Sequence, residues 1–443
     1  MASDRRDRAV RAAVDHQLLS QDHPVAALLD TEGVRASAAE LRAAFAAVTD
    51  APVLHAFAVK AGPLVPVLRL LSQEGLGAEV ASPGELALAR AAGVPPERIV
   101  LDSPAKTPAE LTEALALGVA VNADNPQELS RLDTLLHRTR TTSPLGLRVN
   151  PQIGGGTIDA LSTATPTSKF GIALRDRGAR DEVVRAFLER PWLTRLHTHT
   201  GSQGIPLSLL ATGIREAYEL AEEINEATLR AHGRRQVDTL DIGGGLPVNF
   251  ASDEHTPTFA EYARLLAAEV PGLFDGRYGL VTEFGRSLLA KHGTLLARVE
   301  YTKTSGARPI AVTHAGVQVA TRTVYDPDSW PLRIAAYDAK GRPKDGPLTD
   351  QDVAGPACFA GDLLAVERPL PLLEPGDVIA ALDTGAYYFT AHYAYNSLPR
   401  PGVYGHTESP DGTVHFTTAR PPQQLPDLVT EAGGNHRDAL LGP

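Results

Sequence analysis

A repeated pattern of short apolar runs, each followed by an amphipathic stretch, fills residues 53 to 286 and constrains the fold more than any other feature. The runs are rich in Val, Ile, Leu and Ala, and the stretches between them repeat apolar positions every three or four residues. This alternation is typical of β-strands followed by α-helices. Eight runs occur, at 53–61, 76–82, 98–103, 119–125, 145–150, 194–202, 239–245 and 280–285. Eight βα units in about 230 residues predict an α/β fold, the TIM (β/α)8 barrel.

The sequence changes in character after Arg286. Shorter Val, Ile and Thr runs such as TLLARVEYTKT, RPIAVTHAG and DVIAALDTG are broken by Pro and Gly, which is typical of a β-rich domain. We therefore expect four parts along the chain. They are an N-terminal segment (1–40) that joins the β domain or the edge of the barrel, the barrel (41–288), a β-rich C-terminal domain (289–420) and an irregular tail (421–443).

Charge and composition restrict the kind of partner. The net charge of -11 and the pI near 5.7 argue against nucleic acid or an anionic membrane surface, since both favour a basic face. No stretch approaches the roughly 18 apolar residues of a spanning helix, so we expect a cytoplasmic protein that acts on a small molecule. The single cysteine, Cys358, excludes an internal disulfide framework.

Chemically apt residues follow the ends of several predicted strands, where the active site of a TIM barrel lies. Lys60 ends the first run, behind the apolar residues of AFAVKAG. Desolvation there would lower the pKa of the ammonium and favour the neutral amine that condenses with aldehydes. A surface lysine at a strand end is the plainer alternative. The other residues at these ends are His199, Ser202, Gly243, Gly244, Gly245, Glu283 and Arg286.

The glycine triplet and Glu283 each suggest a contact with a cofactor. Backbone N–H groups of DIGGGLP could bind a phosphate, because phosphate sites of such barrels commonly follow strands 7 and 8, although a tight turn would explain the glycines equally well. Glu283 could keep a ring nitrogen protonated and so make the ring a better electron acceptor. An ordinary salt bridge between Glu283 and Arg286 is the alternative.

His197 and His199 fall on one face of a β pattern. Two histidines at this spacing suggest metal binding, but no matching cysteine or carboxylate set accompanies them, so we expect no metal. A core histidine satisfied by hydrogen bonds is one reading of His199. A flat ring stacked on a cofactor is the other.

Ordered motifs along most of the chain resemble the fold-type III decarboxylases that depend on pyridoxal 5'-phosphate (PLP). The resemblance is greatest to diaminopimelate decarboxylase, with ornithine decarboxylase and alanine racemase as relatives. The motifs are FAVKA, GAEVASPGEL, SKFGI, HTHTGSQ, DIGGGLP, TEFGRSLLA, ACFAGDLLA, DTGAY and YNSLPRPG.

The resemblance implies a role for each matching residue. Lys60 holds PLP as a Schiff base, His199 stacks on its ring and Glu283 pairs with its ring nitrogen. Cys358 returns a proton to Cα and comes from the partner subunit, which implies a homodimer with shared active sites. The phosphate contacts are Ser202, Gly243 to Gly245 and Tyr387, and the substrate contacts are Arg286, which also lies at the cofactor, Arg333 and Tyr337.

The sequence departs from diaminopimelate decarboxylase at the substrate's far end. That family has a glutamate after the cysteine, which reads the distal ammonium, whereas Phe359 follows Cys358 here. A phenyl ring cannot accept a hydrogen bond from an ammonium, and leaving that ammonium unpaired costs several kcal/mol. Gly62 and Leu398 replace an asparagine and an arginine that the family often has. We therefore expect a substrate other than meso-diaminopimelate, with a distal carboxylate and an apolar part near Phe359.

Three other functions stay open at this point. The first is an amino-acid racemase or epimerase of the same fold, although a glutamate at position 283 favours decarboxylation over racemisation. The second is a non-catalytic PLP-binding protein, which would leave the β domain with Cys358 and Tyr387 unexplained. The third is a metal-dependent hydrolase built on His197 and His199, which would give Lys60 no task.

Overall fold

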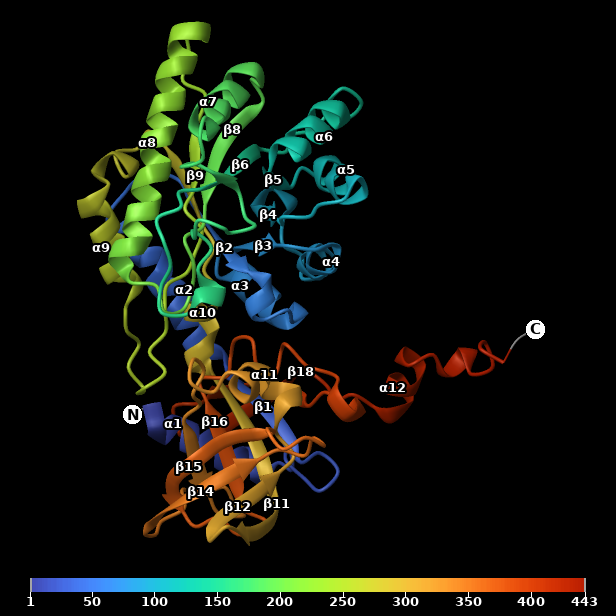
Figure 1. Ribbon diagram of the computed structural model, residues 1–443. Helices are drawn as coiled ribbons and strands as arrows, with labels where there is room; N and C mark the ends of the chain where they lie inside the picture. The colour runs from blue at the N-terminus through green and yellow to red at the C-terminus, as the bar shows by residue number, and fades with distance from the viewer. Residues whose placement is uncertain (1, 442–443) are drawn as a thin grey trace. The chain divides into compact units, whose positions relative to one another are not determined.

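The structure, a computed structural model, describes residues 2–441 and divides into two compact units (Figure 1). One unit comprises Val34–Asn249 and Glu254–Leu288 and contains the parallel strands. The other comprises the chain up to Gly33, the short segment Phe250–Asp253 and the residues from Leu289 onward. Both the predicted barrel and the β-rich second domain are confirmed, and each unit is described separately below.

The first unit is a closed barrel of eight parallel strands with helices on its outside (Figure 1). The order is β5-β4-β3-β2-β10-β9-β8-β6, and pairing between β5 and β6 closes the ring; the two-residue strand β7 (Ile172–Ala173) adds to β6. All eight predicted runs form barrel strands. They are β2 (Val53–Ala58), β3 (Gly77–Val80), β4 (Ile99–Asp102), β5 (Ala120–Ala123), β6 (Leu145–Asn150), β8 (Leu193–Thr198), β9 (Thr239–Asp241) and β10 (Gly279–Thr282).

Three successive helices of the barrel begin with the same four-residue signal. Ser82, Thr107 and Asn125 are each followed by proline and then, three positions after the cap, by glutamate. The cap side chain accepts a hydrogen bond from the glutamate N–H, and proline fits the first turn because it has no N–H to satisfy. The barrel helices are α2 (Thr31–Ala46), α3 (Val65–Gln73), α4 (Pro83–Ala91), α5 (Pro108–Leu117), α6 (Pro126–Leu136), α7 (Ala179–Glu189), α8 (Leu207–His232) and α9 (Phe259–Glu269).

No helix between residues 2 and 441 combines the length and the apolar character that crossing a bilayer requires.

The barrel interior changes from apolar to charged along the strands. Ala56, Val100, Ala120 and Val281 form an apolar cluster inside the barrel. Two residues beyond Val100, Ala120 and Val281 the chain presents polar groups on the same side, because alternate residues of a strand face the same side. Val100 is thus followed by Asp102, which opens the site at the C-terminal end of the barrel.

His55 lies on the outer face of β2 and makes the barrel sensitive to acid. Its Nδ1 lies 2.8 Å from the Thr282 hydroxyl, and its ring packs edge-on against Phe45 of α2. Burial lowers the pKa of His55 to about 4, and the positive charges of Arg42 and Arg98 add to the shift. Folding therefore keeps the ring neutral, whereas the unfolded chain binds a proton below about pH 6.5.

We expect the stability that neutral His55 contributes to be complete above about pH 6.5 and to be lost as the pH falls toward 4. Between about pH 7.5 and pH 5 the loss is about 2 kcal/mol. Urea unfolding at both pH values tests this in the wild type and in His55→Phe, which cannot titrate. An equal loss of stability in both proteins would contradict the assignment.

The second unit is a mixed β-sheet with three helices. The main path runs β15-β14-β12-β11-β1-β17-β18, and β13 and β16 form a side branch that pairs with β11. Strand β1 lies between β11 and β17, antiparallel to β11 and parallel to β17. The strands are β1 (Val25–Asp30), β11 (Gly293–Ser305), β12 (Arg308–Thr313), β13 (Ile334–Tyr337), β14 (Leu348–Ala354), β15 (Leu363–Pro371), β16 (Val378–Leu382), β17 (Gly402–Glu408) and β18 (Val414–Arg420).

The helices of this unit are α1 (Ala2–Asp15), α11 (Val317–Tyr325) and α12 (Leu425–Glu431). Helix α12 lies in the segment that the sequence predicted to be irregular. It begins with Pro426 in its first turn, and Arg400 forms an ion pair with Glu431 at its end, 2.8 Å apart. The proline-rich sequence before helix α12 favoured the prediction of an irregular segment, since proline occurs both at helix starts and in loops.

Candidate active site

Seven polar side chains line the barrel interior near the C-terminal ends of its strands; we call them the ionic layer. All are buried, although burying charge is costly unless partners compensate it. Each comes from a different strand or from the residue directly after one. They are Glu79, Asp102, Asn122, Arg148, His197, Asp241 and Glu283.

His197 joins two carboxylates of the ionic layer. Its Nδ1 lies 3.5 Å from Oδ1 of Asp102, and its Nε2 lies 3.6 Å from Oε2 of Glu283. Burial alone would lower the pKa of His197, but the charges of Asp102, Asp241 and Glu283 together raise it well above its usual value. Arg148 donates to Oδ2 of Asp102 at 2.9 Å, so a cation supports that carboxylate on each side.

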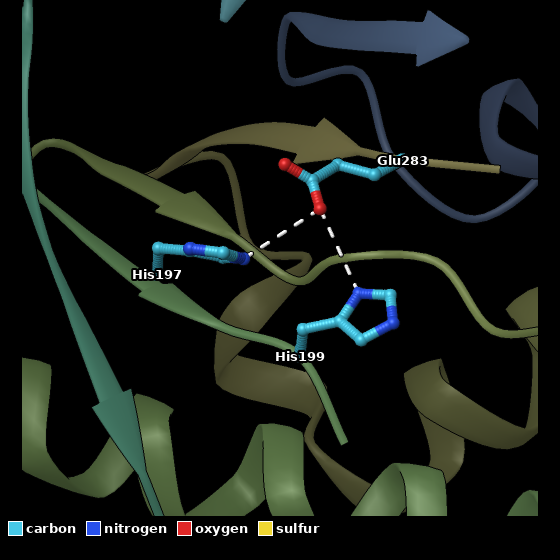
Figure 2. Close-up of side chains that lie close together, drawn as sticks. All are labelled: His197, His199 and Glu283. Atoms are coloured by element: carbon cyan, nitrogen blue, oxygen red, sulfur yellow. Dashed lines mark ion pairs between the residues drawn. The ribbon is translucent and has the colours of Figure 1, made fainter. Parts of the chain in front are cut away.

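Glu283 is the negative group at the centre of this arrangement (Figure 2). Burial opposes its charge, but the charge of His197 holds the pKa of Glu283 well below its usual range. Oε2 faces both imidazoles, whereas Oε1 is buried without a hydrogen-bond partner among the residues described. A buried carboxylate oxygen with no donor is costly, and a protonated ring nitrogen of a bound cofactor would satisfy it.

His199 is held with a fixed orientation. The Gly244 N–H donates to its Nδ1 at 3.2 Å, so the ring carries its hydrogen on Nε2. Burial also lowers the pKa of His199, which favours the neutral ring. The 3.6 Å between Nδ1 and Oε2 of Glu283 is longer than a hydrogen bond. His199 therefore presents a neutral, flat ring beside a charged carboxylate.

His197, His199 and Glu283 are close enough to one another to hold a metal ion. A metal needs neutral imidazoles with an available lone pair. The lone pair of Nδ1 of His199 already accepts the Gly244 N–H, and the pKa of His197 is raised by its carboxylates. This hydrogen bonding favours an ion-pair network over a metal centre.

Lys60 differs from its predicted environment. It lies in the 3-10 turn Val59–Ala61 after β2, its side chain is 48% exposed, and its Nζ lies 2.6 Å from Oε2 of buried Glu79. The lysine thus has a carboxylate partner rather than the purely apolar surroundings expected from AFAVKAG. Burial raises the pKa of Glu79 to about 7, against the opposing charge of Lys60. Glu79 can exchange a proton near neutral pH.

The glycine triplet after β9 packs closely against its neighbours. One of its N–H groups donates no hydrogen bond to any described residue. The Gly243 N–H donates to Oδ1 of Asp241 at 3.1 Å, and the Gly244 N–H donates to His199. A Cβ on Gly244 would lie 2.1 Å from the Glu283 carbonyl oxygen, so only glycine fits there. The Gly245 N–H is left for an anion.

Ser202 and Arg286 complete the predicted set in the barrel. Ser202 follows β8 and is half-buried, with its N–H donated to the Leu161 carbonyl. Arg286 is 4% exposed and begins the short helix α10 (Arg286–Leu289). The barrel unit therefore brings together Lys60, His199, Ser202, the glycine triplet, Glu283 and Arg286 near one end.

The β domain carries the other predicted residues. Cys358 is exposed, and its backbone N–H donates to Oδ1 of Asn396 at 2.8 Å. Tyr387 has a φ of 66°, a left-handed conformation that is uncommon outside glycine and typical of functional sites. The guanidinium of Arg322 lies over its ring, 4.4 Å from the centroid.

Two predicted substrate contacts are placed elsewhere. Tyr337 is 1% exposed in the core of the β domain, and its hydroxyl donates to Oδ1 of Asp7 at 2.7 Å. Arg333 meets Asp383 with a bidentate contact, with NH2 2.9 Å from Oδ2, and lies 2.7 Å from Asp253. In this structure the Tyr337 hydroxyl and the Arg333 guanidinium are thus occupied by carboxylates of the same domain. Their contact with substrate stays a prediction.

Arg322 on α11 is the arginine that sequence reasoning missed. Its guanidinium stacks on Trp330 and Tyr387, and no described carboxylate pairs with it. Its Nη1 is buried without a hydrogen-bond partner among residues 2–441, and burial lowers the pKa of the group. A half-buried guanidinium without a carboxylate partner among the described residues favours a bound anion such as a carboxylate. The one available sequence signal was an arginine inside a short apolar stretch, VQVATRTVY.

The ionic layer was also missed, apart from His197 and Glu283. Its signal is visible in the sequence, because apolar runs such as LGAEVAS, RIVLDS and LGLRVN each contain a charged residue at an inward position. The missed residues are Glu79, Asp102, Asn122, Arg148 and Asp241.

Comparison with known proteins identifies the family. Residues 32–290, more than half of the chain, match the family described as pyridoxal-dependent decarboxylase, pyridoxal binding domain. The chain belongs to this family. This pyridoxal-dependent decarboxylase is most like diaminopimelate decarboxylase, as its motifs indicated.

Individual relatives cover most of the enzyme. Diaminopimelate decarboxylase of Aquifex aeolicus is 30% identical over 349 residues, which are 78% of this chain and 79% of the relative. That of Pseudomonas aeruginosa is 33% identical over 370 residues, 82% and 85% of the two chains. The crystal structure of diaminopimelate decarboxylase from Helicobacter pylori complexed with L-lysine is 26% identical, with a TM-score of 0.77 and coverage of 93% and 97%. The enzyme is thus a PLP-dependent amino-acid decarboxylase, and the donor-free Oε1 of Glu283 fits this cofactor.

Proposed function

We propose that this enzyme decarboxylates an amino acid that carries a distal carboxylate but lacks the free distal ammonium of diaminopimelate. The observation that carries the proposal is Phe359, directly after Cys358, where diaminopimelate decarboxylase has a glutamate. The Phe359 ring lies parallel to that of Tyr325, 5.9 Å between centroids, so its surroundings offer aromatic faces to a ligand. A primary ammonium there would lose hydrogen bonds to water without gaining an acceptor.

The barrel residues would hold and orient PLP. Lys60 would bind it covalently, His199 would lie against its ring, and Oε1 of Glu283 would accept a hydrogen bond from its ring nitrogen. Ser202 and the Gly245 N–H would contact its phosphate, with the phenol of Tyr387 as the further contact that the family resemblance implies. When bound, PLP accepts the electrons left on Cα after the carboxylate departs.

Protons would be moved by two groups. Glu79 lies 2.6 Å from Nζ of Lys60 and has a pKa near 7, so it can take a proton from the lysine and return it. Cys358 of the partner subunit would give the proton that replaces the carboxylate at Cα, as the resemblance implies. The active enzyme would therefore be a homodimer.

Arg322 is the better candidate for the substrate's distal carboxylate. We expect Arg322→Met, which keeps most of the apolar stem, to raise KM by about 100-fold for a substrate with that carboxylate. KM for an amino acid without a distal carboxylate should change by less than about threefold. Steady-state kinetics on such a substrate pair measures both.

Arg333→Met is the matched comparison. It leaves buried Asp383 without its main partner and should destabilise the enzyme by about 3 kcal/mol, while KM stays within about threefold. Urea unfolding and the same kinetics test it. A rise in KM with Arg333→Met but not with Arg322→Met would restore the original assignment.

The experiment that tests the function is release of carbon dioxide from a panel of amino acids by PLP-loaded enzyme. The panel includes meso-diaminopimelate, lysine, ornithine, arginine, glutamate and N-acylated diamino acids. We expect turnover of a member that has a distal carboxylate and no free distal ammonium. Efficient turnover of meso-diaminopimelate would overturn the proposed substrate, and release from no member would overturn the proposed reaction.

A further inference from the structure

Four aromatic side chains of the β domain form a continuous group of two exposed and two half-buried rings, which we call the aromatic cluster. Phe359 stacks on Tyr325 with an interplanar angle of 10° and meets Tyr395 edge-on at 5.2 Å. Tyr393 joins Tyr395 at 5.9 Å and Tyr325 at 6.3 Å. Tyr325 is 58% exposed and Tyr393 is 41% exposed. Exposing this much aromatic surface is unfavourable unless a ligand covers it.

The aromatic cluster is connected to Cys358 and Arg322, the two groups of this domain that we propose take part in the reaction. Phe359 is the neighbour of Cys358, whose N–H is held by Asn396, the residue after Tyr395. Asn396 has a φ of 52°, and this strained turn fixes the thiol segment against the aromatic segment. The cluster and Cys358 are therefore one structural element.

Helix α11 links the cluster to Arg322. Tyr325 lies three residues after Arg322, so the two side chains are neighbours on the helix surface. The Tyr393 N–H donates to the Gln318 carbonyl of the same helix at 3.0 Å, which fixes the other side of the cluster. The β domain thus presents a guanidinium without a carboxylate partner next to a surface of aromatic rings.

The printed ring contacts of the cluster join its four aromatic residues to one another, and among the described residues they include no exposed carboxylate. Asp362 is the acid whose charge acts on Tyr325. Its carboxylate is 3% exposed and accepts the N–H groups of Val317 and Ala357, at 2.6 and 2.7 Å. A primary ammonium placed on the rings would keep only cation–π attraction in exchange for its hydration. A neutral amide bearing an apolar or aromatic group loses far less.

We propose that the substrate is a diamino acid with a distal carboxylate whose distal amine is acylated, best by an aromatic acyl group that stacks on Phe359 and Tyr325. The inference rests on the proposed function and specifies its substrate class. Arg322 binds the distal carboxylate, and the aromatic cluster covers the acyl group. The acyl group removes the positive charge that the rings cannot pair.

The test is kcat/KM for three substrates of the PLP-loaded enzyme: meso-diaminopimelate and its derivatives acetylated or benzoylated on the amine far from the reacting carbon. We expect the benzoyl derivative to exceed free diaminopimelate by at least about 100-fold, with the acetyl derivative between them. Phe359→Leu should reduce the benzoyl advantage over acetyl by about tenfold, because it removes the stacked ring. Phe359→Glu should shift preference toward the free ammonium.

Tyr301→Ala is the matched control, since Tyr301 is an exposed tyrosine of the same domain, 67% exposed and outside the cluster. It should leave the order of the three substrates unchanged. Equal kcat/KM for the three substrates, or selectivity that Phe359→Leu does not alter, would overturn the inference and leave decarboxylation intact. Loss of dimerisation in the Phe359 variants without a change in selectivity would overturn it in favour of a second copy of the chain as occupant.

Discussion

Lys60→Ala is expected to abolish both the visible absorbance of bound cofactor and the release of carbon dioxide. Lys60 would be the covalent attachment point for the cofactor. Its Nζ lies 2.6 Å from Oε2 of Glu79, and among the described residues no other amine occupies this position. Removing a residue of this kind typically lowers kcat by at least about 1,000-fold. Absorbance spectra after dialysis and carbon dioxide release measure the two effects independently.

A second inactive variant serves as the control for correct folding and subunit assembly. Cys358→Ala should retain the absorbance and lose turnover, since Cys358 would donate a proton rather than hold the cofactor. If the sites are shared across a homodimer, an equal mixture of the two variants should recover up to about a quarter of wild-type activity after subunit exchange. Retained absorbance in Lys60→Ala would remove this lysine as the attachment point.

Glu283→Gln is expected to lower kcat by about 100- to 1,000-fold with nearly the same side-chain volume. The substitution removes the negative charge of Glu283, which His197 stabilises, and with it the support for a protonated ring nitrogen. Loss of one preorganised electrostatic partner has effects of this size. Carbon dioxide release at saturating substrate measures kcat. Cofactor absorbance recorded over a range of pH values reports whether the ring nitrogen is still protonated.

Asp241→Asn is the matched control in the same ionic layer. Burial and the charge of Glu283 raise the pKa of Asp241 well above its usual value, so an amide replaces this carboxyl group with less electrostatic change than it does at Glu283. Asn122, whose Nδ2 lies 3.0 Å from Oδ2 of Asp241, can turn its amide to keep the hydrogen bond. We expect kcat to fall by less than about tenfold. A loss equal to that of Glu283→Gln would mean that the layer responds to any substitution, not to the charge of Glu283.

Local sequence was sufficient for the scaffold of the site. The period of apolar residues predicted all eight barrel strands, because strand and helix periods are properties of consecutive residues. Lys60, His199 and Glu283 were predicted in the same way, since a residue at the C-terminal end of a barrel strand lies on the active-site face. The sequence also contained the departure at Phe359, which carries the proposal on substrate.

Contacts between distant residues decided the rest. Arg333 and Arg322 look alike in the sequence, but the fold gives Arg333 the carboxylates of Asp253 and Asp383, whereas no carboxylate in residues 2–441 pairs with Arg322. The partner of Lys60 is Glu79, whose pKa depends on burial and on charges from other strands. Solvation and charge pairing depend on which residues are neighbours in space, and the order of residues along the chain does not reveal those neighbours. The sequence by itself therefore determined the barrel and the ends of its strands, whereas tertiary structure alone decided which charges are paired and which remain for a ligand.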